Sequence, residues 1–136
     1  MDDQKEIIED ILQIENYSIP QDGWFKADGY VIKTNIQKIL MVISNGQWCY
    51  EKWGYLMSEY NFEEFIGAEI LNMERVDKAM KVYNSLPEYM DDGDTVFINI
   101  NTNKGLLQFV AYNSHNGYYG HSVKIISKQL NYETSI

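Results

Sequence analysis

The chain is poor in cysteine, proline and histidine, and these shortages narrow what it can be. Its 136 residues include a single cysteine, Cys49, so no disulfide can form within the chain. A fold without internal disulfides suits the reducing cytoplasm, where we expect this protein to work. No apolar run approaches the roughly eighteen residues of a membrane span, and the acidic N-terminus lacks the apolar stretch of a signal peptide. The sequence therefore predicts a cytoplasmic protein with no membrane partner.

Basic residues are also scarce. Lysines and arginines number 11 against 20 aspartates and glutamates, which gives a formal charge of −9. Such a charge repels phosphate backbones and anionic lipids, so direct binding of DNA or RNA is disfavoured. It favours a protein partner, and a basic nucleic-acid-binding protein would meet the carboxylates as a mimic of a phosphate backbone. The plainer interpretation, that the charge serves solubility alone, stays open.

Motifs for catalysis and for cofactors are missing as well. No glycine-rich loop leads into the Lys-Ser/Thr of a phosphate site. Neighbouring carboxylates such as Glu63-Glu64 and Asp91-Asp92 point apart on a strand or a helix, so they do not form an acid–base pair. The thiol of Cys49 lies inside an apparent strand, which is typical of a buried, inert cysteine. We therefore expect a non-enzymatic protein that needs no cofactor.

What the chain has in quantity is aromatic and β-branched residues. Hydrophobic residues make up 45% of it and aromatics 14%, enough for a sizeable core in a single domain over 1–136. Runs rich in β-branched and aromatic residues predict strands, and the run at 95–101 also alternates between apolar and polar residues. These strands are expected at 28–34, 38–44, 47–55, 68–76, 95–101, 106–113 and 121–127. The dipeptide Asn45-Gly46 predicts a tight turn from the second strand into the third.

A helical spacing recurs near the N-terminus, at Ile7, Ile8, Ile11 and Leu12. Since this spacing covers one face of a 3.6-residue period, residues 1–16 are predicted to form a helix.

Two further segments, 61–65 and 78–86, are candidates for short helices, although the second also alternates like a strand. The tail from 131 is expected to fray. The predicted fold class is α+β: a mostly antiparallel sheet of about six strands within 28–127, with the N-terminal helix and one or two short helices on one face.

The segment NSHNGYYGHS, residues 113–122, gathers the most reactive side chains. It places His115 and His121 around Tyr118 and Tyr119, with two glycines between them. Glycine lets a backbone approach a ligand closely, and the rings and histidines can stack on or donate to one. The segment is therefore a candidate binding site for a partner or a small ligand. The competing interpretation is a tight connection whose tyrosines pack on the sheet edge.

A metal site is a weaker alternative. Cys49, His115 and His121 are ligands that zinc accepts, and Glu51 or Asp94 would add a carboxylate. The two histidines are six residues apart, which is not the spacing of a standard zinc finger, and a single cysteine provides no C-x-x-C pair.

Four aromatic residues within a short stretch form a second candidate surface. On a strand, Trp48 and Tyr50 fall on one face. Trp53 and Tyr55 fall on the opposite face. One face then exposes large rings unless a helix or a second subunit covers it. The stretch is therefore a candidate interface for a protein partner or a homodimer, and packing against the first helix is an equal alternative.

Three strings of the chain carry a family resemblance: VISNGQWCYEKWGYLMSE, FIGAEI, and FINI followed one residue later by TNKGLLQFVAYNSHNGYYGH. They resemble a domain family of unknown function from Firmicutes and their phages and integrative elements. The resemblance covers about residues 29–127 and is most specific over 108–121. Family members tend to carry a second cysteine where this chain has Tyr50. The resemblance implies a small cytoplasmic domain with a phage or mobile-element association, and no known reaction from which catalytic residues follow.

The sequence therefore predicts a non-enzymatic, acidic binding protein of phage or mobile-element origin that acts on a host or defence protein. A small-ligand-binding domain that uses the loop between His115 and His121 is one alternative, and a metal-dependent protein is another.

Overall fold

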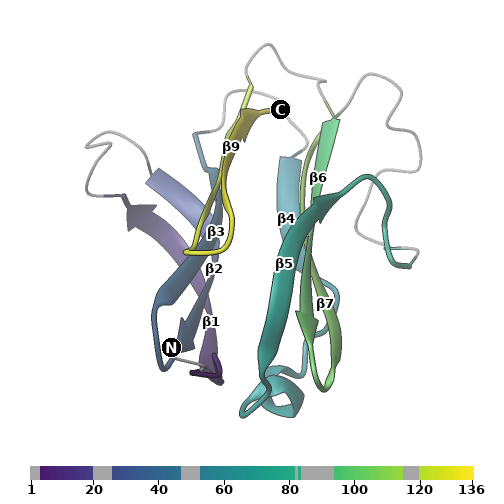
Figure 1. Cartoon of the computed structure of the whole chain (residues 1–136). Coiled ribbons are helices and arrows are strands. Elements are labelled where there is room, and N and C mark those ends of the chain that lie inside the picture. Colours follow the sequence, from purple (N-terminus) through teal and green to yellow (C-terminus); the bar gives the residue numbers. More distant parts are fainter. Residues whose placement is uncertain (1–3, 20–25, 47–52, 82, 84–93, 115–119) are drawn as a thin grey trace.

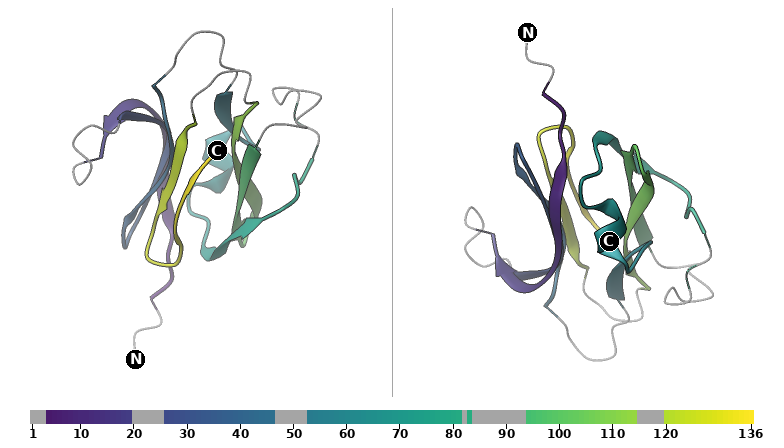
Figure 2. Two further views of the ribbon diagram at one scale, coloured as in Figure 1. Left: turned by 90° about the horizontal axis from the view of Figure 1, so that it is seen from above. Right: turned by 90° about the horizontal axis from the view of Figure 1, so that it is seen from below.

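The chain forms two antiparallel β-sheets that face one another, as Figure 1 shows for this computed structural model. The structure describes residues 4–19, 26–46, 53–81, 83, 94–114 and 120–136. The five-stranded sheet has the order β1-β2-β3-β8-β9, and the four-stranded sheet has the order β4-β7-β6-β5. Views from above and below show the two sheets as separate layers (Figure 2).

The five-stranded sheet consists of β1 (Ile8–Ser18), β2 (Lys26–Thr34), β3 (Lys38–Ser44), β8 (Ser122–Ile126) and β9 (Asn131–Ser135). The four-stranded sheet consists of β4 (Trp53–Met57), β5 (Ile70–Val76), β6 (Asp94–Thr102) and β7 (Gly105–Asn113). A short 3-10 turn, η2 (Phe62–Phe65), precedes β5.

The predicted α+β class, with one sheet of about six strands, is wrong. Within the described residues there is no α-helix, and η2 stands where a short helix was expected. None of these residues forms a helix long and apolar enough to cross a membrane. Two predicted hairpins, β2–β3 and β6–β7, are confirmed. The error concerns which strands share a sheet, because β3 pairs with β8 while β4 pairs with β7 in the opposite layer.

The predicted N-terminal helix is a strand, β1, and a bulge explains the helical spacing. Ile8 and Ile11 are both buried in the core although they are three positions apart, which would place them on opposite faces of a regular strand. The pairing of β1 with β2 shifts register between Ile8 and Asp10, so one additional residue in β1 returns Ile11 to the core side. A bulged strand therefore imitates the pattern of a helix face, and the β-branched isoleucines were the signal for a strand.

The C-terminal tail, expected to fray, is the edge strand β9. It pairs with β8 from Ile126↔Asn131 to Ser122↔Ser135. Side-chain contacts explain why the tail forms a strand. Tyr132 packs against the core, and the guanidinium of Arg75 lies 5.3 Å from the centre of the Tyr132 ring.

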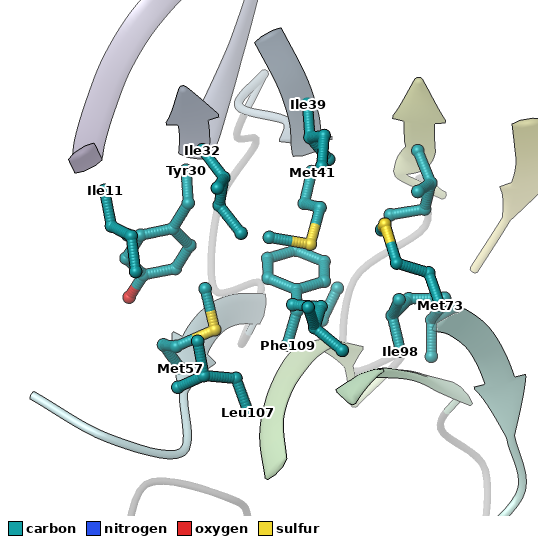
Figure 3. Packing of buried hydrophobic residues seen from close by; sticks show 14 of the residues in the cluster. Ile11, Tyr30, Ile32, Ile39, Met41, Met57, Met73, Ile98, Leu107 and Phe109 are labelled. Atoms are coloured by element: carbon teal, nitrogen blue, oxygen red, sulfur yellow. The ribbon is translucent and has the colours of Figure 1, made fainter. Parts of the chain in front are cut away.

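The core lies between the sheets, and side chains from both layers interlock there (Figure 3). Met41 of β3 points at the ring of Phe109 of β7, and both are fully buried. Tyr30 meets Phe109 edge to face with ring centres 6.1 Å apart, and it meets Tyr55 in the same way at 5.7 Å. Burial of these aliphatic and aromatic side chains is the main favourable contribution to the packing of the two sheets.

The burial of two tyrosines predicts a stability loss at alkaline pH. Burial raises the pKa of Tyr30 to about 12, with a smaller contribution from neighbouring Tyr55, and burial raises the pKa of Tyr83 to about 12. The folded state thus favours the neutral phenols, whereas the unfolded chain ionises near pH 10. The stabilisation is complete below pH 10 and is lost as the pH rises from 10 to 12. Urea unfolding across pH 8–12 should show this decline, and it should be shallower in Tyr30→Phe and in Tyr83→Phe. An equal decline in both variants and the wild type would contradict this assignment.

Candidate functional site

One end of the sandwich brings together the flanks of four sequence segments, 20–25, 47–52, 84–93 and 115–119. In the five-stranded sheet, Ser18 pairs with Lys26, and the next residue of β2 pairs with Ser44. In the four-stranded sheet, Asn113 lies between Trp53 and Asp94 and pairs with both. The end of β3 and the starts of β4 and β6 lie at the same end of the two layers (Figure 1). At this end, each of the four segments is therefore preceded or followed by a residue that the structure describes.

His121 connects the two sheets at this end. Its ring nitrogen Nδ1 lies 2.7 Å from the carbonyl oxygen of Ser44, and its ring stacks on Trp53 with centres 4.7 Å apart and planes inclined by 30°. A carbonyl oxygen only accepts hydrogen bonds, so Nδ1 carries the hydrogen and only Nε2 remains for any other contact. The side chain is 1% exposed. His121 therefore holds β3, β4 and the start of β8 in a fixed arrangement.

The main chain next to this ring is fixed as well. His121 and Ile136 exchange two main-chain hydrogen bonds of 2.7 and 2.8 Å, which extend the β8–β9 pairing by one more pair. The buried side chain of Asn113 donates to the main-chain oxygen of Ile136 at 3.0 Å, and so connects β7 to the end of the chain. The amide of Ser122 donates to the hydroxyl of Ser44 at 2.9 Å. The result is a rigid polar base between the sheets.

Two of the predicted site residues, Trp53 and His121, are described, and the structure brings them into direct contact. The other four, Trp48, His115, Tyr118 and Tyr119, lie outside the described residues, as does Cys49. No group of three potential metal ligands occurs among the described side chains. The proposed set of Cys49, His115 and His121 therefore stays a prediction. For His121 such a role would have to use Nε2.

Sequence reasoning missed the buried side chain of Gln108, which organises the outer face of the four-stranded sheet. Its amide oxygen accepts from the main-chain nitrogen of Met80 at 3.0 Å and from the hydroxyl of Tyr83 at 2.7 Å. Its amide nitrogen donates to the carbonyl of Lys78 at 3.0 Å and to the side chain of Asn99 at 2.8 Å. A glutamine inside an alternating strand was the available signal, because a buried amide requires partners.

A hollow of about 530 Å³ lies beside Gln108, and apolar side chains, among them Val76, Met80 and Leu106, line much of it. The four hydrogen bonds of Gln108 use both hydrogens and both acceptor positions of its amide. The amide of Gln108 is therefore committed to holding Lys78, Met80 and Tyr83 against the sheet. The remaining polar lining comes from the exposed Asp77 and Lys78 and from Asn99, which already accepts from Gln108, so the hollow ranks below the His121 end as a candidate site.

The family model named "Domain of unknown function (DUF7448)" matches residues 5–125. Because this match covers most of the chain, the protein belongs to that family. The expectation of a domain family of unknown function is thereby confirmed. No curated protein and no solved structure matches the chain.

Proposed function

We propose that this DUF7448 protein is a non-enzymatic binding domain, which holds a basic protein partner at the His121 end of the sandwich. The observation that carries the proposal is the convergence of the flanks of four segments on one rigid base. Binding proteins with two packed sheets commonly place their variable, ligand-contacting loops at one end of the sandwich.

The sequence content of the four segments supports a protein partner. Together they hold seven aromatic residues: Trp24, Phe25, Trp48, Tyr50, Tyr89, Tyr118 and Tyr119. Tyrosine and tryptophan dominate many binding surfaces because a large, amphipathic ring loses little conformational freedom when it is buried. The segments also hold five carboxylates: Asp22, Glu51, Glu88, Asp91 and Asp92. Against these stands one basic residue, Lys52. Aromatic anchors among carboxylates fit a basic surface.

The partner in this proposal is a nucleic-acid-binding protein of the host, such as a defence protein, and the domain acts in the cytoplasm as a phage or mobile-element inhibitor. The formal charge of −9 supports this choice, since carboxylates can occupy a surface shaped for phosphates. The sequence resemblance to phage and integrative-element proteins supports the same biological setting.

The test is a pull-down from nuclease-treated bacterial lysate with three forms of the protein. The wild type should retain basic proteins that elute at moderate salt, because screening weakens charge-driven contacts. A variant with Trp48→Ser, Tyr118→Ser and Tyr119→Ser should lose them. Met80→Ser, which removes an exposed apolar side chain from the segment after β5, should retain them.

Equal retention by the triple variant and the wild type would overturn the proposal, and so would capture of acidic proteins alone. Thermal melting of all three forms shows whether any loss of binding reflects a loss of folding.

A further inference from the structure

The opposite end of the sandwich has two halves on either side of the N-terminal segment 5–8, one richer in lysine and the other richer in exposed carboxylates. On one side, the side-chain oxygen of Asn35 accepts from the main-chain nitrogen of Ile7 at 2.8 Å. The main-chain nitrogen of Asn35 donates to the carbonyl of Ile7 at 3.2 Å. On the other side, Ile8 exchanges hydrogen bonds of 2.8 Å with Ala68 and Gly67. The segment thus joins the β2–β3 turn of one sheet to the start of β5 in the other. The two halves are therefore neighbours on one surface.

The half formed by the five-stranded sheet carries three lysines, and the Glu6 carboxylate accepts hydrogen bonds from Thr34 and Gln37 at the same turn. Lys33 of β2 lies directly opposite Lys38 of β3. Continuing the register Leu40↔Ile126 by two residues sets Lys38 beside Lys128, whose amide donates to the side chain of Gln37 at 2.8 Å. Like charges directly across a sheet destabilise it. None of these three lysines makes an ion pair with another described residue.

The half next to the four-stranded sheet carries two exposed glutamates and exposed apolar groups, and the Lys104 ammonium also lies here, where it donates to the carbonyl of Ile66 at 3.1 Å. Glu63 and Glu64 are exposed on η2 and, within the described part of the chain, neither has an ion-pair partner. Tyr60, just before η2, is 77% exposed, and Ile66, just after it, is 37% exposed. Large exposed rings and aliphatic groups beside charges are features of protein interfaces. Here they occur on a turn that hydrogen bonds hold in place.

We propose that this end is the interface of a two-fold symmetric homodimer. A two-fold axis through the boundary between the halves places the lysines of each copy against Glu63 and Glu64 of the other. The same patch then serves both subunits, and the assembly closes at two copies. Tyr60 and Ile66 lie next to the charge contacts and lose their exposure to water. A standard interface covers about 800 Å² on each partner, which is about a tenth of the 8126 Å² surface of this chain.

A second copy fits this surface better than an unrelated partner. Any partner must offer acidic groups to the lysine half and basic groups to the glutamate half. A second copy rotated by two-fold symmetry offers this pattern automatically. A partner of one charge would match one half and repel the other.

The test uses two charge-reversal variants of the full chain and analytical ultracentrifugation at low and high salt. The wild type should dimerise, and salt should weaken the dimer. Lys33→Glu with Lys38→Glu gives an end with exposed carboxylates on both halves, and Glu63→Lys with Glu64→Lys gives an end with lysines on both halves. Each variant alone should dimerise at least about tenfold more weakly, because like charges meet. Mixed in equal amounts they should form a heterodimer, and all four changes in one chain should restore the homodimer.

Glu74→Lys, at an exposed position on the outer face of the four-stranded sheet, is the matched control and should leave the dimer unchanged. A wild type that stays monomeric at low salt would overturn the proposal. It would also fail if the dimer withstood both reversals, or if the mixed variants did not associate. All positions are exposed, so thermal melting should show folded variants. The proposal is independent of partner binding at the His121 end, and the pull-down and the sedimentation experiment can fail separately.

Discussion

Gly29→Ala should destabilise the protein by about 3 kcal/mol or more, the largest effect we expect from a single methyl group. Gly29 lies inside β2, between Ile14 of β1 and Val42 of β3. A Cβ atom at this position would lie 2.0 Å from the main-chain oxygen of Met41 and 2.8 Å from the Cα of Val42. These are backbone atoms of a central strand, so no side-chain rotation can relieve the overlap. The strands must separate, which weakens the pairing of β2 with β3.

The measurement is urea unfolding followed by tryptophan fluorescence, with equal slopes as the condition for comparing midpoints. Gly46→Ala is the matched control, because a Cβ there meets nothing within 4 Å and the residue is exposed. The control should unfold within about 0.5 kcal/mol of the wild type. If the two alanine variants unfolded at the same midpoint, the close approach of β2 and β3 would be wrong.

Local patterning predicted the central strands because they are rich in β-branched and aromatic residues, and because β6 alternates between its two faces. In β6, Val96, Ile98 and Ile100 face the core, while Phe97 joins a separate cluster on the outer side. Such alternation depends only on the two-residue period of a strand, so it is readable from sequence. The assignment of strands to sheets depends on long-range pairing, for which a single sequence carries little signal. The turn at Asn45-Gly46 suggested that β3 would pair with the following strand, and yet β3 pairs with β8.

The candidate site was predictable by residue type but not by role. The sequence identified His121 as a side chain able to bind, and the structure shows it 1% exposed with Nδ1 committed to Ser44. No local pattern indicates that a carbonyl some 77 residues earlier in the chain will accept from that ring. Trp53 was proposed as an interface residue, and the structure shows its ring stacked on His121, as part of the base between the two sheets.

The net charge of the chain could be counted from its sequence, but the distribution of the charges over the surface could not. Counting alone gives −9 and suggests one uniformly acidic surface. The pairing of Lys33 with Lys38, and their approach to Lys128, follows only from strand register. A dimer formed through that end would leave the two His121 ends free. Each dimer could then hold two copies of a partner, with a gain in affinity for a dimeric or clustered one.

His121→Ala should lower the free energy of unfolding by about 3 kcal/mol, because it empties a buried site and removes a hydrogen bond at once. Two further variants separate these contributions. His121→Phe keeps a ring against Trp53 but leaves the carbonyl of Ser44 without its donor. His121→Asn keeps a donor close to the position of Nδ1 but removes the ring. Both should be less destabilised than the alanine variant, and hydrogen exchange at Ile136, whose amide donates to the His121 carbonyl, should follow the same order.

The same three variants distinguish a structural histidine from one that binds a ligand. If His121 acts only through Ser44 and Trp53, His121→Asn should recover part of the stability and most of the partner binding, because the hydrogen bond to Ser44 is kept. If Nε2 holds zinc or a small ligand, asparagine should recover stability without recovering binding, since its amide has no nitrogen at the position of Nε2. Elemental analysis and native mass spectrometry of the wild type, run beside the unfolding series, would then show a bound species that disappears in all three variants. Recovery of both properties in His121→Asn, with no such species in the wild type, would identify the imidazole as the element that fixes the two sheets to each other.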